Sequence, residues 1–559
     1  MDMKLLHQKF CKETFGPTGV IEKFEPVYGE DFNFAYDVID AIAKEEPARR
    51  AMVWCNVAGE KRTFTFGEMA DYASRAARLF LDHGIRRGDR VMLVLKRHYQ
   101  FWPAILGLHK IGAIAIPATH LLTAKDYLYR FGSAGVSAIV ASAEDGTPAH
   151  IEEAMASYPG LKPRFIVRGE KEGWLNFDRL AEETEPLAER LPTKVTDTML
   201  LYFTSGTTGY PKMVCHDFSY PIAHIVTAKY WHNVDPDGLH LTVSETGWAK
   251  SVWGKLYGQW FLPAGIFVYD FDKFIPADLL EKIEEYRLTT FCAPPTIYRF
   301  LIKEGLERYD LSSLQYVTTA GEALNPEVFK QFEQKTGLRI HEAYGQTETT
   351  VLMGNFVGAP VEKVGSLGKA GPLYDVDIVG EDGQPLPPGE VGEIVVRTPD
   401  GVHPIGMFQK YYEGGGENAA RTEDVWHDGL YHTCDTAWKD EDGFFWYVGR
   451  TDDVIKSSGY RIGPFEIESV LMELPQVLEC GVSGVPDPIR GQVVKATIVL
   501  AKGYEPSDGL AKEIQNYVKK QTAPYKYPRI VEFVDELPKT ISGKIRRVEL
   551  RQTGKTKVE

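Results

Sequence analysis

The chain has few cysteines, no long apolar segment and no excess of positive charge, and each shortage excludes a class of protein. Its six cysteines lie far apart, form no CxxC pair and are too few for a disulfide framework, which favours a reducing compartment. No stretch is long and apolar enough to cross a bilayer. The formal net charge of -15 disfavours binding of a nucleic-acid backbone through bulk electrostatics. Any anionic ligand must therefore be held by local groups.

The first residues also lack the features that targeting signals share. MDMKLLHQKFCKETFGP has no apolar central region, and Asp2 and Glu13 argue against an Arg-rich, acid-poor transit peptide. These observations predict a cytoplasmic protein.

What the chain does have is enough material for more than one core. It contains 559 residues, of which 43% are hydrophobic and 25% are charged, values typical of a globular protein. Single cores stop growing at roughly 250 to 300 residues, so two or more domains are expected.

The first 350 residues show helices alternating with short apolar runs. Thr65 and Glu68 have the spacing of a capping box, and Gly84 supplies a stop signal, which predicts a helix between them. Candidate strands lie at 90–95, 113–117, 136–142, 198–204, 265–270, 288–294 and 314–321. Short buried strands that alternate with helices predict βαβ units and parallel sheets.

The pattern changes from about residue 360, where Gly- and Pro-punctuated short runs predict antiparallel β structure. After GRTDD (449–453) comes a compact region with helices expected near 464–473 and 508–520 and strands near 477–483 and 493–500. We place a domain boundary at Asp452, which divides the chain into domains 1–451 and 452–559.

The stretch TSGTTGYPK (204–212) follows an apolar run, at the carboxyl end of an expected strand, where open α/β sheets bind ligands. It is not a GxxxxGK[ST] loop, because its glycines are too close and Met213 replaces the hydroxyl residue. Taken alone, it also fits an ordinary polar turn. Its candidate phosphate-binding groups are hydroxyls, glycine amides and one ammonium: Thr204, Ser205, Gly206, Thr207, Thr208, Gly209 and Lys212.

Five further motifs follow in a fixed order: AGEAL (320–324), EAYGQTE (342–348), YHTCD (431–435), GRTDDVIKSSGYRIGPFEIE (449–468) and PKTISGK (538–544). With TSGTTGYPK they resemble the core motifs of the adenylate-forming superfamily, which includes acyl-CoA synthetases, luciferases and nonribosomal peptide adenylation domains. GYRIGPFEIESVLMELPQV, VPDPIRGQVVKA and EFVDELPKTISGKIRR are most similar to the medium-chain acyl-CoA synthetases. The resemblance covers most of the chain after about residue 60.

This resemblance implies an α/β fold, with a large N-terminal domain of two α/β subdomains plus a β-barrel and a small mobile α+β C-terminal domain. It implies an ATP-dependent, AMP-forming acyl-CoA synthetase, an acid-thiol ligase for a medium-chain, branched or aryl carboxylic acid. ATP, Mg2+ and coenzyme A would be its cofactors and substrates, and a homodimer is one assembly compatible with this class. No nucleic acid or membrane span is expected.

The resemblance also assigns roles to residues in the first half-reaction, in which a carboxylate attacks ATP to give acyl-AMP. Lys544 would contact the α-phosphate and carboxylate, and Glu348 with Thr347 would bind a magnesium-bound phosphate. Lys212 would help to hold the other phosphates. The remaining nucleotide-binding residues would be Asp435 and Arg450 at the ribose, Tyr344 at the adenine, and Gly321, Glu322, Ala323, Glu342, Gly345 and Gln346 along the nucleotide. Cys434 stands where the family usually has glycine, which leaves the local backbone geometry open.

For the second half-reaction, the resemblance places the hinge of the mobile domain at Asp452. Ser458, Gly459 and Arg461 would line the path of coenzyme A. Trp248 and Gly345 would line the acyl pocket, and the glycine should leave that pocket open where short-chain relatives carry tryptophan. No residue is evident as a base for the thiol.

Two alternatives remain open. An adenylating enzyme could pass its acyl group to a carrier-protein thiol, and SSGYRIG favours coenzyme A without deciding the matter. A non-catalytic nucleotide- or acyl-binding relative is the other alternative, and the joint presence of Lys544, Glu348 and Asp435 argues against it.

Overall fold

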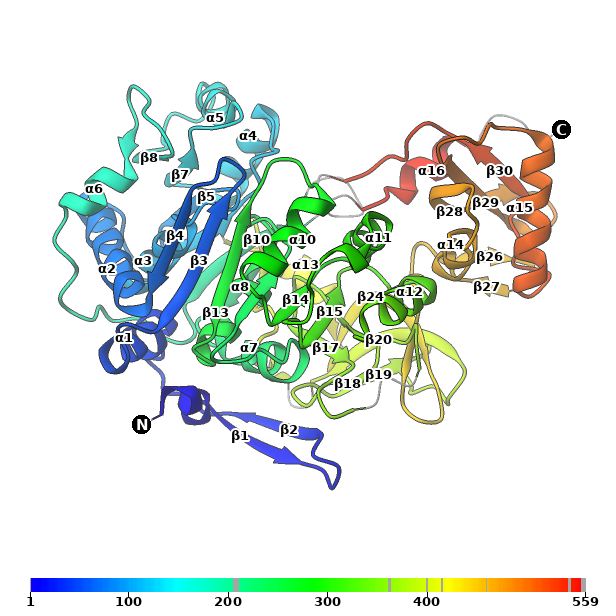
Figure 1. Cartoon of the computed structure of the whole chain (residues 1–559), viewed down its shortest axis with the longest axis horizontal. Coiled ribbons are helices and arrows are strands. Elements are labelled where there is room, and N and C mark those ends of the chain that lie inside the picture. The colour runs from blue at the N-terminus through cyan, green and yellow to red at the C-terminus, as the bar shows by residue number, and fades with distance from the viewer. Residues whose placement is uncertain are drawn as a thin grey trace.

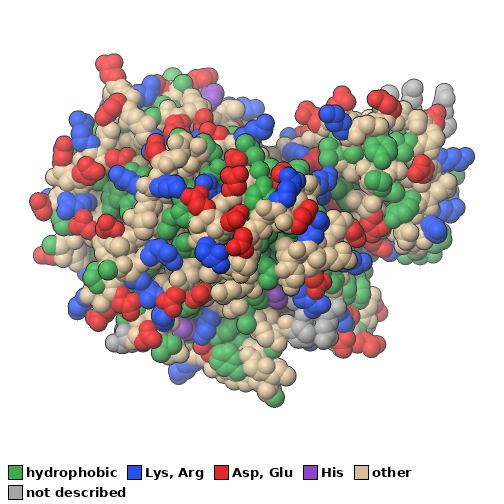
Figure 2. Space-filling view, viewed as in Figure 1, with side chains coloured by type: hydrophobic (Ala, Val, Ile, Leu, Met, Phe, Trp, Pro, Cys, Tyr) green, Lys and Arg blue, Asp and Glu red, His purple; other side chains and the backbone are tan. Residues whose placement is uncertain are grey.

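Two large α/β sheets form the body of the molecule, and two smaller sheets follow them along the chain (Figure 1). The computed structural model describes residues 2–204, 211–359, 363–398, 401–413, 416–458, 460–540 and 544–553. Within these ranges, every helix is too short or too polar to traverse a bilayer. Figure 2 shows the C-terminal part of the chain as a lobe of its own, set beside the larger body.

The first α/β sheet has a parallel centre and an antiparallel edge. Its nine described strands, in spatial order, are β22 (Gly416–Glu417), β21 (Lys410–Glu413), β11 (Lys212–Asp217), β10 (Thr198–Thr204), β6 (Ile114–Pro117), β5 (Arg90–Val94), β7 (Ala138–Ser142), β8 (Arg164–Val167) and β9 (Leu175–Asn176). The predicted alternation of strands and helices is confirmed here. The sequence did not predict that β21 and β22, which lie far beyond β11 in the chain, extend the same sheet.

The second α/β sheet repeats this plan, with antiparallel strands at both edges. Its nine described strands, in order, are β18 (Lys369–Ala370), β17 (Val351–Gly354), β16 (Ile340–Gly345), β15 (Tyr316–Ala320), β14 (Thr290–Cys292), β12 (Leu239–Thr242), β13 (Gly265–Asp270), β3 (Arg50–Asn56) and β4 (Lys61–Thr65). β15 and β16 end in the AGEAL and EAYGQTE motifs, so the sheet delivers both motifs to one edge.

Helices cover the two sheets, and the largest hydrophobic core lies between them. The predicted capping box is present at α2, where Thr65 and Glu68 bond each other's backbone N–H groups. The α-helices of the body are α1 (Ala41–Glu45), α2 (Phe66–Asp82), α3 (Phe101–Ile111), α4 (Ala124–Ala134), α5 (Thr147–Met155), α6 (Phe177–Glu183), α7 (Tyr220–Ile225), α8 (Ala249–Lys255), α9 (Tyr257–Phe261), α10 (Pro276–Glu285), α11 (Pro295–Glu304), α12 (Pro326–Thr336) and α13 (Ala419–Glu423).

The loop just before α8, which contains Glu245 and Gly247, contacts the end of β6 and so connects the two α/β sheets. A Cβ atom on Gly247 would lie 2.4 Å from the backbone nitrogen of Thr119, so only glycine fits against the end of β6. Beside it, the carboxylate of Glu245 accepts a hydrogen bond from the Thr119 hydroxyl at 2.9 Å. The start of α8 is therefore fixed relative to both sheets.

An antiparallel sheet follows, as the sequence predicts from about residue 360. It contains β19 (Val376–Val379), β20 (Val391–Arg397), β24 (Leu430–Lys439) and β23 (Trp426–His427), and β25 (Phe445–Arg450) pairs with β24. This sheet occupies the place of the expected barrel, and its strand pairs in the described ranges form an open series. Its strand β24 carries YHTCD, and β25 leads into the predicted hinge.

The C-terminal domain is α+β, as expected. Its described strands are β27 (Tyr460–Ile462), β26 (Ile455–Ser457), β29 (Gly491–Leu500) and β28 (Val477–Asp487), with β30 (Ile530–Phe533) alongside β29. Its helices are α14 (Pro464–Leu471), α15 (Asp508–Gln521) and α16 (Arg547–Thr553). A separate core of aliphatic residues holds this domain together.

The sequence patterns did not predict the two elements at the N-terminus. A short helical turn at Met3–Lys9 precedes a hairpin of β1 (Cys11–Phe15) and β2 (Ile21–Pro26), which lies below the body in Figure 1. The sequence of this hairpin does not alternate cleanly between apolar and polar residues, so its period is weak.

Candidate active site

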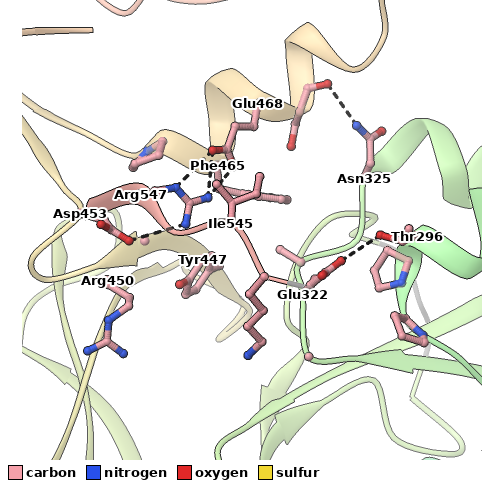
Figure 3. A pocket seen from close by; sticks show the side chains of 18 of the residues that line it. Thr296, Glu322, Asn325, Tyr447, Arg450, Asp453, Phe465, Glu468, Ile545 and Arg547 are labelled. Carbon is pink, nitrogen blue, oxygen red and sulfur yellow. Dashed lines mark hydrogen bonds and ion pairs between the residues drawn. The ribbon is translucent and has the colours of Figure 1, made fainter. Parts of the chain in front are cut away.

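A cleft of about 1920 Å3 lies between the N-terminal body and the C-terminal domain, and Figure 3 shows part of its wall. It is lined by the ends of β15 and β16, by β24 and β25, and by the segment that precedes α16. Most residues predicted from the motifs line it: Thr204, Lys212, Gly321, Glu322, Ala323, Glu342, Tyr344, Gly345, Gln346, Thr347, Glu348, Asp435, Arg450, Asp452 and Lys544. Residues of six motifs, from Thr204 to Lys544, thus meet in one place.

The other predicted residues fall into two groups. Ser205, Gly206, Thr207, Thr208, Gly209 and Gly459 lie outside the described residues. Trp248, Ser458 and Arg461 are described but do not contribute to the described lining of the cleft. Trp248 precedes α8, and the other two lie on the hairpin of β26 and β27.

Asp435 is held by three side chains, which orient its carboxylate in the cleft wall. Its Oδ2 accepts hydrogen bonds from the Tyr344 hydroxyl at 2.6 Å and from Gln346 Nε2 at 2.7 Å. The Tyr447 hydroxyl donates to Oδ1 at 3.3 Å. Asp435 also pairs in register with Arg450 across β24 and β25. The three donors therefore fix the orientation of the Asp435 carboxylate in the cleft wall.

The backbone at Cys434 adopts the conformation that a glycine would take at this position. Its φ is +58°, in the left-handed region that glycine enters freely and other residues enter at a cost of about 1 to 2 kcal/mol. The Cys434 N–H donates to Glu393 Oε1 at 2.8 Å, which helps to hold this conformation. The turn that a glycine would make is therefore retained with a cysteine side chain.

A second cluster forms around Glu348, where β10 ends and β11 begins. The Tyr411 hydroxyl donates to Glu348 Oε1 at 2.9 Å, and the Lys212 ammonium lies 5.0 Å from the centre of the Tyr411 ring. This places a positive charge and a carboxylate on either side of one phenol. Such a pair suits a ligand that carries both phosphate charge and a bound cation.

His216 holds the backbone of this cluster, although no motif in the sequence indicated it. Burial lowers the pKa of His216 to about 4, so the ring is neutral at physiological pH. Its Nε2 lies 2.7 Å from the carbonyl oxygen of Thr347, which can only accept, so Nε2 carries the proton. His216 thereby fixes the peptide that joins Thr347 to Glu348.

Glu342 is a buried carboxyl on β16, at the start of the EAYGQTE motif. Its Oε1 accepts the N–H of Leu324 at 2.9 Å, whereas its Oε2 is buried without a hydrogen-bond partner among the described residues. Burial raises the pKa of Glu342 to about 8. At neutral pH this side chain is therefore a neutral acid.

Lys544 reaches the cleft from a tight turn in the C-terminal domain. Its backbone N–H donates to Thr540 Oγ1 at 3.1 Å, and its carbonyl accepts from Thr540 N at 2.8 Å. Burial lowers the pKa of Lys250 in the N-terminal body, and the Lys544 charge lowers it further. Lys544 therefore lies near enough to Lys250 of the body for the two positive charges to repel each other.

Gly345 is backed by a tryptophan that the sequence reasoning missed. A Cβ atom on Gly345 would lie 2.6 Å from Cη2 of Trp253 and 2.3 Å from the carbonyl oxygen of Thr350. Trp253 is buried in α8, and its Nε1 donates to the Tyr220 hydroxyl at 3.0 Å. A ring from α8 therefore packs directly against this glycine of β16, and the open acyl pocket expected at this position stays a prediction.

Comparison with known proteins agrees with this arrangement. Residues 39–412 match the family described as AMP-binding enzyme, and residues 466–544 match its C-terminal domain. The chain belongs to the AMP-binding enzymes. Human acyl-coenzyme A synthetase ACSM3, mitochondrial, is 40% identical over 94% of this AMP-binding enzyme and 90% of its own length. The rat mitochondrial acyl-coenzyme A synthetase ACSM5 is 42% identical over 93% and 90% of the two chains.

A solved structure of similar fold is an anthranilate CoA ligase, AuaEII, in complex with anthranoyl-AMP. It superposes on this AMP-binding enzyme with a TM-score of 0.84 at 27% identity and covers 94% of this chain and 98% of its own. The predicted fold class and the reaction class, AMP-forming synthesis of acyl-CoA through acyl-AMP, are confirmed by these relatives.

The predicted cytoplasmic location is wrong, because the curated relatives of this AMP-binding enzyme are mitochondrial proteins. The cysteine pattern indicates whether a protein lies in reducing or oxidising surroundings. It cannot tell one reducing compartment from another, which is why the prediction failed. Location is set by addresses that receptors read, and the composition of a folded domain does not contain them.

Replacing Glu342 with glutamine should test its neutral state. The folded pKa of about 8 lies above the ordinary value of 4.5, so the folded protein binds the extra proton between these values and loses stability as pH rises from 4.5 to 8. Glutamine mimics the neutral acid at every pH. We therefore expect Glu342→Gln to raise the thermal unfolding midpoint over wild type, with a larger gain at pH 9 than at pH 6.

The exposed Glu441→Gln provides the matched control, and its unfolding midpoint should follow that of wild type at both pH values. The KM for ATP of Glu342→Gln should stay within about threefold of wild type at pH 7. A loss of stability at pH 9, together with a large rise in KM, would mean that Glu342 works as a carboxylate.

Proposed function

We propose that this enzyme activates a medium-chain, branched or aromatic carboxylic acid with Mg-ATP and transfers the acyl group to coenzyme A. The observation that carries the proposal is the meeting of Lys544 from the C-terminal domain with Lys212, Glu348 and Asp435 of the body around one cleft. A carboxylic acid with a pKa of roughly 4 to 5 is ionised at neutral pH and needs no general base. The first half-reaction therefore needs neutralised charge and alignment, which these residues supply.

Each residue then has a role in forming acyl-AMP. Lys544 stabilises charge on the α-phosphate and the attacking carboxylate, and Lys212 stabilises the departing pyrophosphate. Asp435 accepts from the ribose hydroxyls, and Arg450 lies beside it. The adenine would lie against Tyr344 and the segment Gly321 to Ala323, with Glu342 and Gln346 at its edge.

Magnesium fits the residues around Glu348. Mg2+ prefers oxygen ligands and is commonly held by one or two carboxylates together with substrate phosphates. Glu348 offers a carboxylate in the cleft wall, and the Thr347 hydroxyl stands next to it for a phosphate oxygen. The bound ion would neutralise phosphate charge.

The second half-reaction would use another pose of the C-terminal domain, with domains 1–451 and 452–559 turning about Asp452. This division is supported by the position of Ser458 and Arg461, which lie away from the cleft that Lys544 lines. Arg461 instead pairs with Glu381 at 2.5 Å. A rotation that withdraws Lys544 would bring Ser458, Gly459 and Arg461 toward the cleft, where coenzyme A would enter.

The acyl pocket would lie at Gly345, with Trp253 as its floor and Trp248 near its rim. Relatives that act on different acids suit a pocket whose depth is set by one side chain. Assembly into a homodimer stays a prediction from the sequence.

Pyrophosphate release tests the proposal. With Mg-ATP and acids from acetate to decanoate, plus 2-methylbutyrate and benzoate, we expect release to peak at mid-length or branched acids and to turn over repeatedly only with coenzyme A. Lys544→Ala should lower acyl-AMP formation by at least 100-fold and largely spare thioester formation from supplied acyl-AMP, because the lysine acts on charge that develops only in the first step.

The exposed Lys502→Ala is the matched control in the same domain and should behave as wild type in both halves. Equal loss in both halves for Lys544→Ala would contradict the division of roles. A single stoichiometric burst that coenzyme A cannot sustain would favour a carrier-protein acceptor, and absence of pyrophosphate release with every acid would favour the non-catalytic alternative.

Shortening Trp253 should change the preferred acid. Trp253→Leu removes the ring that fills the space behind Gly345, and each added methylene that it admits contributes about 0.8 kcal/mol of burial. Two further methylenes would shift the ratio of kcat/KM for decanoate over butyrate by roughly tenfold. Trp174→Leu, at a similarly buried tryptophan of the first α/β sheet, controls for general loss of packing. An unchanged ratio in Trp253→Leu would place the end of the acyl chain elsewhere.

A further inference from the structure

Helix α14 contacts the N-terminal body on one side and the segment that carries Lys544 on the other (Figure 3). The carbonyl oxygen of Ser469 accepts a hydrogen bond from Asn325 Nδ2 of the body at 3.1 Å. The adjacent residue, Glu468, binds Arg547, three residues beyond Lys544. Two neighbouring residues of one helix thus join the adenine side of the cleft to the lysine side.

The orientation of the Asn325 amide is determined by its second contact. Its Oδ1 accepts the N–H of Glu327 at 2.7 Å and so caps α12, which means that Nδ2 is the atom facing Ser469. Asn325 directly follows the AGEAL motif, and Leu324 before it is bonded to Glu342 at 2.9 Å. The donor that reaches the C-terminal domain is therefore rigidly connected to the nucleotide-binding edge of the second sheet.

The pair of Glu468 and Arg547 has the geometry of a strong, partly desolvated ion pair. Arg547 Nη2 lies 2.9 and 2.7 Å from the two carboxylate oxygens of Glu468, whose side chain is 10% exposed. Glu468 Oε1 also accepts the N–H of Val482 at 2.8 Å, which fixes the carboxylate to β28. Asp453 lies 3.6 Å from Arg547 Nη1 and also pairs with Arg551.

The chain between Arg547 and Lys544 is held by several contacts, so the position of Arg547 determines the position of Lys544. The N–H of Arg546 donates to the carbonyl of Pro538 at 2.8 Å, and Thr540 bonds the backbone of Lys544. Ile545 packs on Gly481 of β28, where an added Cβ atom would lie 3.2 Å from its Cγ2. Movement of Arg547 relative to β28 would therefore move the Lys544 backbone with it.

We propose that Asn325, Glu468 and Arg547 are positioning residues for the adenylation step, which set the depth at which Lys544 enters the cleft. The hydrogen bond from Asn325 joins the body to α14, and the Glu468–Arg547 pair joins α14 to the lysine segment. The proposal rests on the proposed function, in which Lys544 acts on the α-phosphate.

The two links differ in when they are used. The Glu468–Arg547 pair lies within the C-terminal domain and travels with it, whereas the Asn325–Ser469 bond crosses between the domains and exists only in a pose like this one. Arg299 adds a weaker contact across the same interface, from Nη1 to the sulfur of Met472 at 3.8 Å. Loss of the Asn325 donor should therefore affect the half-reaction that uses Lys544 and spare the other.

Asn325→Asp separates the two contacts of this side chain. The aspartate still accepts from Glu327 N and caps α12, but it has no donor for the Ser469 carbonyl and places a negative charge against it. We expect acyl-AMP formation, measured as pyrophosphate release, to fall by roughly tenfold in kcat, as the loss of one hydrogen bond implies. Thioester formation from supplied acyl-AMP should stay within twofold of wild type, and the thermal unfolding midpoint should not change.

Asn176→Asp is the matched control, because Asn176 caps α6 through Oδ1 and donates through Nδ2 in the same way, far from the cleft. It should leave both half-reactions unchanged. Equal loss in both halves for Asn325→Asp would overturn the proposal in favour of a structural role, and no loss in the first half would overturn it outright.

A double variant tests whether the two links act as one. Arg547→Lys keeps the charge and loses the two-pronged contact with Glu468, so the first half-reaction should fall by about 10- to 100-fold. Arg529→Lys, at an exposed arginine of the same domain, is its control. If Asn325→Asp and Arg547→Lys act on one position of Lys544, their combined loss will be clearly smaller than the product of the single losses. A fully multiplicative loss would contradict a joint role.

Pyrophosphate release by the wild-type enzyme distinguishes failure of the proposed function from failure of the positioning roles alone. If the wild-type enzyme releases no pyrophosphate with any acid tested, the proposed function fails and the positioning roles fail with it. If it forms acyl-AMP and Asn325→Asp forms it equally fast, the positioning proposal alone is wrong.

Discussion

The wall of the cleft depends on the hydrogen-bonded carboxylate of Asp435. Tyr344 and Gln346 reach it from the second α/β sheet, and Tyr447 reaches it from the antiparallel sheet. Gln346 is itself fixed by the Tyr431 hydroxyl at 2.8 Å. Two separate sheets are thus joined at one acceptor, and loss of this side chain would leave each donor without its partner in a buried site. The turn at Cys434 keeps this carboxylate in place at the cost of a strained backbone.

Around this fixed wall, the C-terminal domain meets the body through polar and aromatic contacts. The described interface includes the bond from Asn325, the contact of Arg299 with Met472 and the pairing of Arg461 with Glu381. The rings of Tyr447 and Phe465 also meet edge to face, with their centres 6.2 Å apart. Polar contacts of this kind contribute little stability individually, so they can be exchanged at small energetic cost while the wall around Asp435 stays in place.

The parts of the fold that depend on local pattern could be predicted from the sequence. The capping box at Thr65, the apolar stripe of α2 and the alternation of buried strands with helices are encoded within a few residues of each other. Motif residues lined the cleft because they follow strands whose carboxyl ends share an edge.

Contacts between distant segments were not predictable, because they have no local signal. Trp253 of α8 meets Gly345 of β16, Tyr411 meets Glu348 from a strand that joins the first sheet, and Asn325 meets α14 across domains. The hairpin at Cys11–Phe15 and Ile21–Pro26 is likewise short and lacks a clear period. The domain boundary at Asp452 and the residue roles in coenzyme A binding stay predictions.

The contact of Gly345 with Trp253 also limits how this part of the cleft can change by substitution. No side chain fits at position 345 on this backbone, since a Cβ atom would lie 2.3 Å from the carbonyl oxygen of Thr350 and 2.6 Å from the Trp253 ring. A larger residue at 345 therefore requires movement of the Thr350 backbone as well as a smaller residue at 253, whereas a smaller residue at 253 creates no clash. The space between β16 and α8 can thus be enlarged by one substitution in the helix, but a side chain cannot be added to the strand in the same way.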